Sequence, residues 1–339
     1  MLNKQFFLDH QEEYFKLKKC QIFTRKDLKI INQRKTIETL PYNYSELYLR
    51  YNEEYSFKEN DFLDISFFVL DDNDLIAFIP LSVSKNSNKF VISSQGQSII
   101  SPYFFVNDNR LNIFEYIYSY YLELMRICQI NKLIIKENYN YIQKNYFNLF
   151  LLQKKLKVEN SILGLIKLDY EISNIKSHFR KSYKSLVNKK YDEFTISQLD
   201  KNDEIGWNDF KNFHLFIAKK RTRSDKSWEI QFKMIKNRQG TLFTIKDNKK
   251  LIGGTFVNLS KIDSYYSVAV FDRSYFPIPL GHILQFFIIK SLKNSNIKYY
   301  ILGEFEKNIN LTKKEENIIS FKKGICTNLE NINNHIITN

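Results

Sequence analysis

The chain has 339 residues, more than one hydrophobic core usually serves, so its length predicts two domains. Lys and Arg number 51 against 37 Asp and Glu, and the formal net charge of +14 suits anionic partners such as CoA, a nucleotide-sugar, tRNA or an anionic membrane. A compositional bias toward Lys, Asn, Ile and Tyr explains this excess equally well. No basic run is long enough for a nucleic-acid-binding arm, so stable DNA binding is not expected.

The cysteines and the N-terminal segment indicate an intracellular setting. Cys20, Cys128 and Cys326 are odd in number and widely spaced, and no Cys/His cluster predicts a zinc site or another metal site. Charges throughout residues 1–19 argue against a signal peptide, and no apolar run approaches the ~20 residues of a membrane helix. We therefore expect a cytoplasmic protein with reduced thiols.

The first half of the chain predicts several strands and one helix. Alternating or continuous apolar residues indicate strands, and apolar residues at helical spacing indicate a helix. Asp and Asn residues at 71–74 mark a turn. The expected strands are 65–70, 75–83, 90–94 and 132–136, and the expected helix is 111–127.

The second half repeats this order, which indicates an ancient duplication, although coincidence of a common α+β order is the alternative. Its expected strands are 240–247, 251–257, 264–270 and 299–304, with a helix at 283–292. A basic helix at 179–187 joins the halves, and no Gly/Ser-rich linker separates them. The expected fold class is α+β, with domains at 1–165 and 166–339.

A proline-glycine loop at 276–282 (FPIPLGH) precedes the second helix and is a candidate phosphate site. Backbone N–H groups at a helix N-terminus are unpaired, and the helix dipole makes the potential there positive. Gly281 lets a phosphate approach the backbone closely, and the two prolines stiffen the loop. The alternative is an ordinary helix start after a β-hairpin.

Several segments, mostly between about 170 and 330, resemble the FemAB-type branch of the acyl-CoA N-acyltransferase (GNAT) superfamily. They are Gly253-Gly254, Tyr265-Tyr266, Asp272, the run from Pro279 to Gln285, the run from Tyr299 to Glu304, and Phe321-Lys322-Lys323-Gly324. The resemblance implies two tandem acyl-CoA N-acyltransferase-like domains, each a mixed twisted sheet flanked by helices. It also implies transfer of an acyl or aminoacyl group to an amine on a cell-envelope sugar or peptide precursor.

The donor site is expected in the second domain, because the first copy lacks a Pro-Leu-Gly helix entry; the first domain would then shape the acceptor groove. Backbone amides near Val268 and Val270 would polarise the acyl carbonyl, and Leu280, Gly281 and His282 would hold the donor phosphates. An acyl-CoA co-substrate is the expected donor, with no permanently bound cofactor. Aminoacyl-tRNA is the alternative, which residues 205–236 do not favour because they are too few for an inserted helical arm.

Two groups of cations are candidate acceptor-binding residues. Arg221 and Arg223, followed by Trp228, would grip an anionic acceptor through paired guanidinium hydrogen bonds and stack on a sugar. Arg180 and Lys184 lie four apart on one helix face and would meet a diphosphate. The alternative for the first group is a solvated loop in which Ser224 is the N-cap of a helix from Lys226 to Lys236. The alternative for the second group is a solvated helix face.

Two carboxylates are the candidate bases, because acyl transfer to an amine requires removal of an ammonium proton. A carboxylate at a strand end can be partly buried, which would raise its pKa and suit a base. Asp272 ranks slightly ahead of Glu304, because it sits between the third strand of this half and the phosphate loop; its alternative role is to pair with Arg273 or to hold the turn at 274–275. Glu306, His214 and His282 are weaker candidates, and His214 is expected to be an ordinary helix residue. A non-catalytic binding module with the same fold and a filled cleft is the rival from another class.

Overall fold

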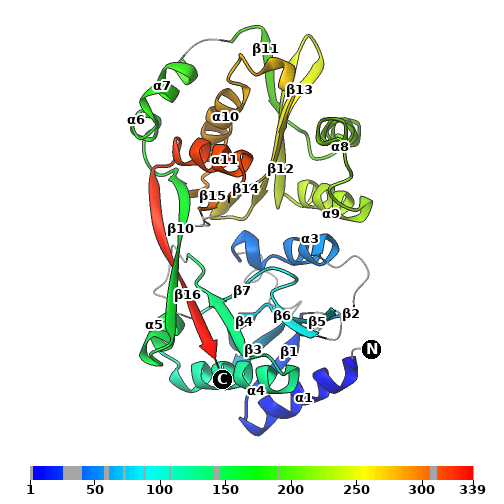
Figure 1. The fold of residues 1–339 in the computed structure, drawn as a ribbon, viewed down its shortest axis with the longest axis vertical. Coiled ribbons are helices and arrows are strands. Elements are labelled where there is room, and N and C mark those ends of the chain that lie inside the picture. The colour runs from blue at the N-terminus through cyan, green and yellow to red at the C-terminus, as the bar shows by residue number, and fades with distance from the viewer. Residues whose placement is uncertain are drawn as a thin grey trace. The chain divides into compact units, whose positions relative to one another are not determined.

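The computed structural model describes residues 3–25, 40–56, 61–71, 74–86, 89–106, 108–139, 146–188, 191–305 and 311–338 (Figure 1). The chain divides into two compact units. Unit 1 comprises Met1–Glu38, Asn52–Asn160 and Ile332–Asn339, and unit 2 comprises Thr39–Tyr51 and Ser161–Asn331. The chain passes from unit 1 to unit 2 at Asn160/Ser161, close to the expected boundary at 165/166. Two short segments, Thr39–Tyr51 and Ile332–Asn339, belong to the unit that is formed mainly by the other half of the chain.

Unit 1 contains three groups of paired strands and a long apolar helix. Its elements are α1 (Lys4–Leu17), β1 (Gln21–Thr24), β2 (Asp61–Asp64), β3 (Phe67–Asp71), β4 (Asp74–Ile79), β5 (Ser82–Asn86), β6 (Lys89–Ser93), β7 (Ile99–Ile100), β8 (Tyr103–Phe104), α4 (Leu111–Cys128), β9 (Lys132–Lys136) and α5 (Tyr146–Gln153). The strand orders are β1-β3-β4-β8, β2-β5-β6 and β16-β9-β7, in which β16 is the strand Asn328–Thr338 near the end of the chain. Helix α4 supplies much of the core through side chains such as Ile117, Tyr121 and Leu124.

The expected single strand at 75–83 is wrong, because it is split at Pro80. Proline has no N–H to donate to a ladder, so a strand cannot pass through it unbroken inside a sheet. Residues on its two sides form β4 and β5, which pair in different sheets. The other strands and the helix expected in this half are confirmed within a few residues.

Unit 2 contains the strands and the helix that were expected for residues 240–304. One helix and two strands, α3, β10 and β16 in the list that follows, have residues in both units. Its elements are η2 (Tyr42–Tyr44), α3 (Glu46–Ser56), β10 (Lys157–Lys167), α6 (Ile172–Ser177), α7 (Lys181–Asn188), β11 (Phe194–Gln198), α8 (Glu204–Ala218), α9 (Asp225–Lys236), β12 (Gly240–Asp247), β13 (Lys250–Leu259), β14 (Asp263–Phe271), η3 (Arg273–Tyr275), α10 (Leu280–Asn294), β15 (Tyr299–Phe305), α11 (Lys313–Lys323) and β16 (Asn328–Thr338). The strand order is β11-β12-β13-β14-β15-β10. The order expected from the sequence for residues 240–304 is confirmed.

Strand β14 leaves its neighbour β15 part-way along its length, and this splay creates room for a site. The two strands pair in parallel over Asp263–Tyr265, whereas β14 continues to Phe271 with β13 as its partner. Among the described residues, no strand pairs with the other edge of β14 beyond Tyr265. A gap with unpaired backbone groups therefore opens beside the second half of β14.

The unit 2 sheet separates two hydrophobic cores. One core contains Leu284 and Ile288 of α10, and the other contains Trp207 of α8 and Trp228 of α9. In Figure 1, α10 and α11 cover one face of the sheet, and α8 and α9 cover the opposite face. Because side chains alternate along a strand, neighbouring residues of β14 face different cores.

Segment Thr39–Tyr51 is held in unit 2 by contacts that sequence order did not indicate. The ring of Tyr42 stacks on Tyr265 with the centroids 5.0 Å apart, and the Tyr42 N–H donates to Asp263 Oδ1 at 3.2 Å. Asp263 is fully buried, and burial raises its pKa to about 6. Residues of this segment therefore pack against the end of β14 that is paired with β15.

Side-chain caps determine where helices α9 and α11 begin. Ser224 accepts a hydrogen bond from the Ser227 N–H at 3.1 Å and starts α9, as expected from the sequence. Thr312 and Glu315 form a capping box that starts α11. Both caps are local, so each helix start is specified by a few neighbouring residues.

Candidate active site

A pocket of about 840 Å³ opens in unit 2 between the second half of β14, the start of α10 and the exposed face of α11. We call it the α10 pocket. It is lined by Tyr266, Ser267, Ala269, Phe271, Arg273, Phe276, Ile278, Pro279, Leu280, Gly281, His282, Lys314, Asn317, Ile318, Phe321 and Lys322. These described lining residues are mostly apolar, and their charged members are all basic. The pocket therefore suits a ligand with an apolar portion and an anionic portion.

The N-terminus of α10 leaves one backbone donor open in the pocket wall. The N–H groups of Leu280, His282 and Ile283 donate to backbone carbonyls of the preceding loop at 2.8–3.1 Å. The N–H of Gly281 donates to no residue that the structure describes, and Pro279 provides no side-chain cap. An unpaired N–H at the positive end of a helix is suited to an anion.

Packing alone does not require glycine at position 281. A Cβ atom placed there would lie 3.6 Å from the Phe321 ring and 3.7 Å from the Phe271 ring, both ordinary contacts. Gly281 therefore leaves an open approach to its own N–H rather than avoiding a clash.

His282 lies in an aromatic setting and is neutral at physiological pH. Its ring centroid is 4.2 Å from that of Tyr183 and 4.9 Å from that of Phe321, in edge-to-face arrangements. Burial, reinforced by the positive charge of Arg180, lowers the pKa of His282 to about 4. Its Nε2 atom is buried without a hydrogen-bond partner among the described residues. His282 consequently forms a wall of the pocket and supplies no positive charge for a phosphate.

Lys322 is the functional candidate that sequence reasoning missed. Its Nζ lies 5.1 Å from the centre of the Tyr266 ring and would be 3.2 Å from a Cβ on Gly303, so the side chain reaches from α11 toward the gap between β14 and β15. Burial lowers the pKa of Lys322 to about 8. An amine with a lowered pKa in a pocket marks a candidate functional group.

A signal for Lys322 was present in the helical spacing of α11. Residues 314, 317, 318, 321 and 322 all line the pocket, and they recur at the intervals that share one helix face. The sequence pattern identified the segment Phe321-Lys322-Lys323-Gly324 but did not indicate which of its two lysines is buried.

Asp272 has the contacts of a turn residue. Its carboxylate accepts hydrogen bonds from the Ser274 hydroxyl at 2.7 Å and the Ser274 N–H at 3.0 Å, and it lies 3.3 Å from Lys250 Nζ. The Ser274 hydroxyl, the Ser274 N–H and Lys250 together lower its pKa. The expectation of a raised pKa is therefore wrong, because the carboxylate is stabilised by these donors and not desolvated. Asp272 is also absent from the described pocket lining, and its contacts favour the structural role.

Glu304 lies on β15 three residues beyond Ile301, the last residue of that strand that pairs with β14, and therefore beside the gap. It follows Gly303 on β15, opposite Leu163 of β10, and its side chain is half-buried. Burial raises the pKa of the neighbouring Tyr265 hydroxyl, and the Glu304 carboxylate raises it further. Glu304 is thus close to the last paired residue of β14, whereas Glu306 lies outside the described residues.

Val268 and Val270 direct their side chains away from the α10 pocket. Each is 7% exposed and packs in the core beneath α8 and α9. Their neighbours Ser267 and Ala269 line the pocket instead. A contribution of Val268 or Val270 to donor binding would come from the strand backbone, as the sequence analysis expected.

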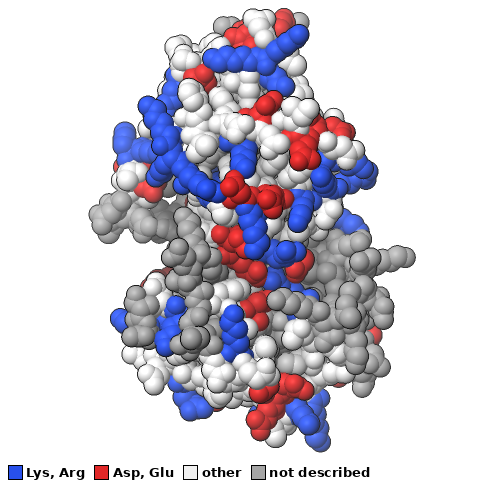
Figure 2. Space-filling model, turned by 90° about the vertical axis from the view of Figure 1, so that its right-hand side faces the viewer, with Lys and Arg blue, Asp and Glu red and all other residues white. Residues whose placement is uncertain are grey.

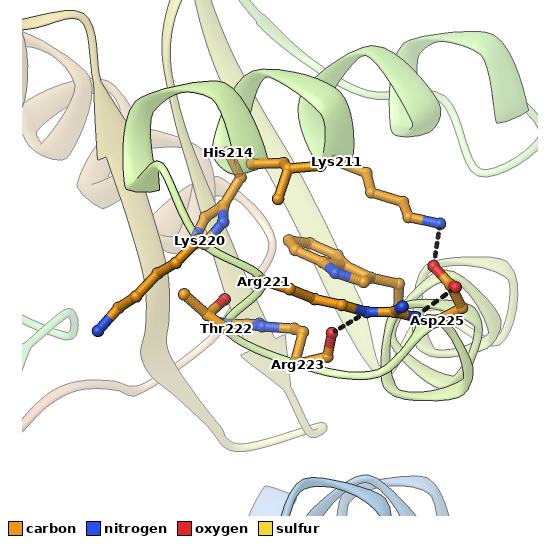
Figure 3. Close-up of a pocket in the computed structure, with 9 residues that line it drawn as sticks. Lys211, His214, Lys220, Arg221, Thr222, Arg223 and Asp225 are labelled. Carbon is orange, nitrogen blue, oxygen red and sulfur yellow. Dashed lines mark hydrogen bonds and ion pairs between the residues drawn. The ribbon is translucent and has the colours of Figure 1, made fainter.

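Arg221, Arg223 and Trp228 come together at a second, smaller pocket of about 180 Å³, which we call the α8–α9 pocket (Figure 3). Its lining residues are Lys211, His214, Leu215, Lys220, Arg221, Thr222, Arg223, Asp225 and Trp228. Asp225 is paired with Lys211 Nζ at 2.7 Å and with the Arg221 guanidinium. The lining carries more positive charge than Asp225 neutralises, so the pocket is suited to an anion.

Trp228 is a core residue whose ring is already covered. It is 6% exposed, and its ring contacts Trp207 and His214 with centroid separations of 5.6 and 5.2 Å. The guanidinium of Arg223 lies 4.6 Å from the ring centre and donates to Gln231 Oε1 at 3.1 Å. The expected stacking of Trp228 on an acceptor sugar therefore has no open ring face to use. His214 is a helix residue as expected, and burial lowers its pKa to about 4.

The two expected groups of acceptor residues do not form one site. Arg180 lies over the Tyr183 ring at 5.0 Å and donates to Ser320 at the end of α11, on the α10 face of the sheet. Lys184 is half-buried on the same helix, α7. Arg221 and Arg223 lie on the opposite face, beside α8 and α9. One clamp made from both groups is therefore excluded by the sheet between them.

No protein-family model matches this sequence, and no curated protein sequence matches it either. Solved structures do match. A crystal structure of FemX superposes with a TM-score of 0.67 at 10% identity, over 92% of this chain and 96% of that chain. The chain has the tandem fold of FemAB-type and GNAT-like proteins. This confirms the expected α+β class and the expected tandem arrangement.

Two further structures extend the likeness to this tandem fold. A tandem GNAT protein from the clavulanic acid biosynthesis pathway superposes with a TM-score of 0.50 at 9% identity, over 94% of this chain and 98% of that chain. The C-terminal domain of a putative lysylphosphatidylglycerol synthetase from Agrobacterium fabrum gives a TM-score of 0.56 at 9% identity, over 91% and 90%. Identities this low establish the fold, so the chemistry has to be argued from the site.

Neither a metal site nor a membrane-spanning helix is found among the described residues. No group of three or more His, Cys, Asp or Glu residues among them is placed to hold a metal ion. None of the helices in the described ranges combines the length and the apolar character needed to cross a membrane.

Proposed function

We propose that this protein is an acyltransferase whose acyl donor binds in the α10 pocket. The observation that carries the proposal is the coincidence of three features in one place. The pocket opens where β14 leaves β15, the open Gly281 N–H lies in its wall, and its described charged residues are Arg273, Lys314 and Lys322. The open backbone edge suits an acyl carbonyl, and the basic groups suit phosphates.

A CoA thioester is the proposed donor. Its pyrophosphate would lie against the Gly281 N–H, near Arg273 and Lys314, and its pantetheine arm would pass over Phe271 and Phe321 toward the gap. An aminoacyl-tRNA is the alternative donor, which the net charge of +14 favours. The proposed acceptor is an amine on a cell-envelope sugar or peptide precursor.

In the proposed reaction the acceptor nitrogen attacks the thioester carbonyl carbon, and the C–S bond breaks as the C–N bond forms. The amine loses a proton to a base, and the thiolate leaves with CoA and takes up a proton. Glu304, on β15 beside the gap, is the proposed base. The Lys322 ammonium would stabilise negative charge on the carbonyl oxygen, and its lowered pKa makes it a ready proton donor to the thiolate.

A non-catalytic binding module remains the rival function, and the open volume of the α10 pocket favours ligand binding over a filled cleft. Isothermal titration calorimetry with acetyl-CoA, followed by measurement of thiol release with amine acceptors, separates the candidates. Binding with thiol release supports the enzyme, and binding without release for any amine supports the module. Absence of CoA-ester binding would exclude this donor and favour aminoacyl-tRNA.

Gly281→Glu is expected to weaken acetyl-CoA binding at least ~10-fold, or about 1.4 kcal/mol. The carboxylate would occupy the approach to the Gly281 N–H and repel the phosphates. Gly281→Ala is the matched control, because the structure has room for its Cβ. Calorimetry should give similar affinity for Gly281→Ala and the unmodified protein. Equal affinity for Gly281→Glu would show that the phosphates lie elsewhere.

Arg221→Ala is expected to raise the KM for an anionic acceptor while donor affinity is unchanged. The α8–α9 pocket lies on the opposite face of β14 from the α10 pocket, so Arg221 would hold a distant anionic end of the acceptor. Arg221 is the better test than Arg223, because Arg223 also packs on Trp228. An unaltered KM would show that the segment containing Arg221 is only a loop that ends in a helix cap and has no role in acceptor binding.

A further inference from the structure

The C-terminal end of α8 exposes two large apolar side chains next to each other. Phe216 is 75% exposed and Leu215 is 50% exposed. The helix ends at Lys219, which adopts a left-handed conformation with φ 54°, and Lys220 and Arg221 follow. We call residues 215–221 the α8 tip. Apolar side chains beside several cations are typical of surfaces that enter the interface of a membrane.

The α8 tip shares a wall with the α8–α9 pocket. Leu215, Lys220 and Arg221 line that pocket as well as forming the tip. Figure 3 shows Lys211 and Arg221 converging on Asp225, whereas Lys220 extends outward and away from it. Lys220 is exposed, so its cation is accessible from outside the molecule.

A buried hydroxyl adds a second anion-binding feature to the pocket. The Oγ1 atom of Thr222 is buried and has no hydrogen-bond partner among the described residues. Arg223, which is 9% exposed, lies in the same lining. A polar atom buried without a partner is costly unless a ligand or water pairs with it. An oxygen of a bound phosphate would accept a hydrogen bond from this hydroxyl.

The other end of α8 is a natural comparison. Ile205 is 77% exposed there, yet its charged neighbours on the helix are Asp203, Glu204 and Asp209. Figure 2 shows the face that carries α8 and α9, where basic and acidic side chains are interspersed. Attraction to an anionic surface would therefore come from the local cations of the α8 tip rather than from a uniformly basic face.

We propose that the α8 tip docks on the surface of an anionic phospholipid bilayer, with Leu215 and Phe216 in the interface and a lipid phosphate in the α8–α9 pocket. Lys219 and Lys220 supply the electrostatic attraction, and the two apolar side chains supply the hydrophobic part. The contact is peripheral. It does not depend on which acyl donor the α10 pocket takes, and a lipid phosphate in the α8–α9 pocket would compete there with the anionic end of an acceptor.

The full chain is mixed with phosphatidylcholine vesicles that do or do not contain phosphatidylglycerol, and the bound fraction is measured by sedimentation. Binding is expected only with phosphatidylglycerol and should fall as NaCl is raised. Phe216→Ser should weaken binding ~10-fold, because an exposed aromatic side chain no longer enters the interface. The pair Lys219→Gln and Lys220→Gln should weaken it ~20-fold, since each cation contributes about a factor of five.

Ile205→Ser is the matched control, because it removes a side chain of equal exposure from the same helix at its acidic end. It should leave vesicle binding unchanged. Circular dichroism melts of all variants establish that each is folded. Equal losses for Phe216→Ser and Ile205→Ser would overturn the proposal, as would equal binding to both kinds of vesicle. Binding of inorganic pyrophosphate by calorimetry without any vesicle binding would also overturn it, in favour of a soluble anionic ligand.

Discussion

Lys322→Met is expected to lower kcat for acyl transfer at least ~10²-fold, the usual cost of removing one group that stabilises the oxyanion. Methionine has a similar length and retains the contact with Tyr266, but it carries no charge. Affinity for acetyl-CoA should change little, because Arg273 and Lys314 also line the pocket and are kept. Steady-state kinetics at saturating donor, with donor affinity from calorimetry, measure the two effects separately.

Lys323→Met is the control for this prediction. Lys323 is the next residue of α11, is exposed, and lies with its Nζ 5.4 Å from the Phe305 ring, outside the described pocket lining. The Lys323→Met substitution removes the same charge from the same helix. It should leave kcat within about twofold of the unmodified protein, as surface substitutions usually do. Equal losses in the two variants would show that net charge or stability is responsible, and Lys322 would lose its catalytic role.

The titration of Lys322 predicts a pH dependence with a defined sign. Its pKa in the folded protein is lowered from 10.5 to about 8, so activity that needs the ammonium should fall as pH rises through about 8. Between that value and 10.5 the unfolded chain binds more protons at this residue, so its contribution to the free energy of unfolding increases with pH. Loss of kcat above pH 8 without loss of Tm would therefore be chemical and not structural. Retention of the same pH profile in Lys322→Met would assign the titration to another group.

Glu304→Gln is expected to lower kcat ~10²-fold, the typical contribution of a general base. We rank Glu304 ahead of Asp272, because Asp272 is held by Ser274 and Lys250 whereas Glu304 lies on β15 beside the gap; neither residue is in the described lining of the α10 pocket. Asp272→Asn is expected to change mainly Tm, since it weakens the turn that leads toward α10. Kinetics and thermal melts of both variants, measured together, test this order.

The pH–rate profile adds a second measurement to this pair. If Glu304 is the base, its replacement removes the acidic limb of the profile while Asp272→Asn retains it. The opposite pattern, with kcat lost in Asp272→Asn at unchanged Tm, would restore the original ranking. A fall of activity only in step with Tm in both variants would leave neither carboxylate with a role in proton transfer.

Local patterns were sufficient for the strands and the helix of unit 2 between residues 240 and 304. The strands at 240–247, 251–257 and 264–270 were predicted because each is a short apolar run bounded by turn residues. The start of α9 followed from Ser224, whose cap involves residues three positions apart. These features depend on neighbours in the sequence, which is why the sequence reveals them.

The sites were less predictable because their properties arise from contacts between distant segments. The lowered pKa of Lys322 results from burial against β14, and the covered ring of Trp228 results from packing between α8 and α9. Both residues carry side chains whose role changes with burial. A sequence pattern identifies their type but not the side of the sheet on which they lie.

The sequence by itself determined the α+β class, the tandem order of elements and the loop at Gly281, because hydrophobic periodicity and turn chemistry act over a few residues. Only the tertiary structure decided that Arg180 and Arg223 lie on opposite faces of the unit 2 sheet, that Asp272 is stabilised in a turn, and that Lys322 reaches the gap beside β14. Burial and electrostatics at each of these positions depend on which segments the fold brings together, and that information is spread over the whole chain.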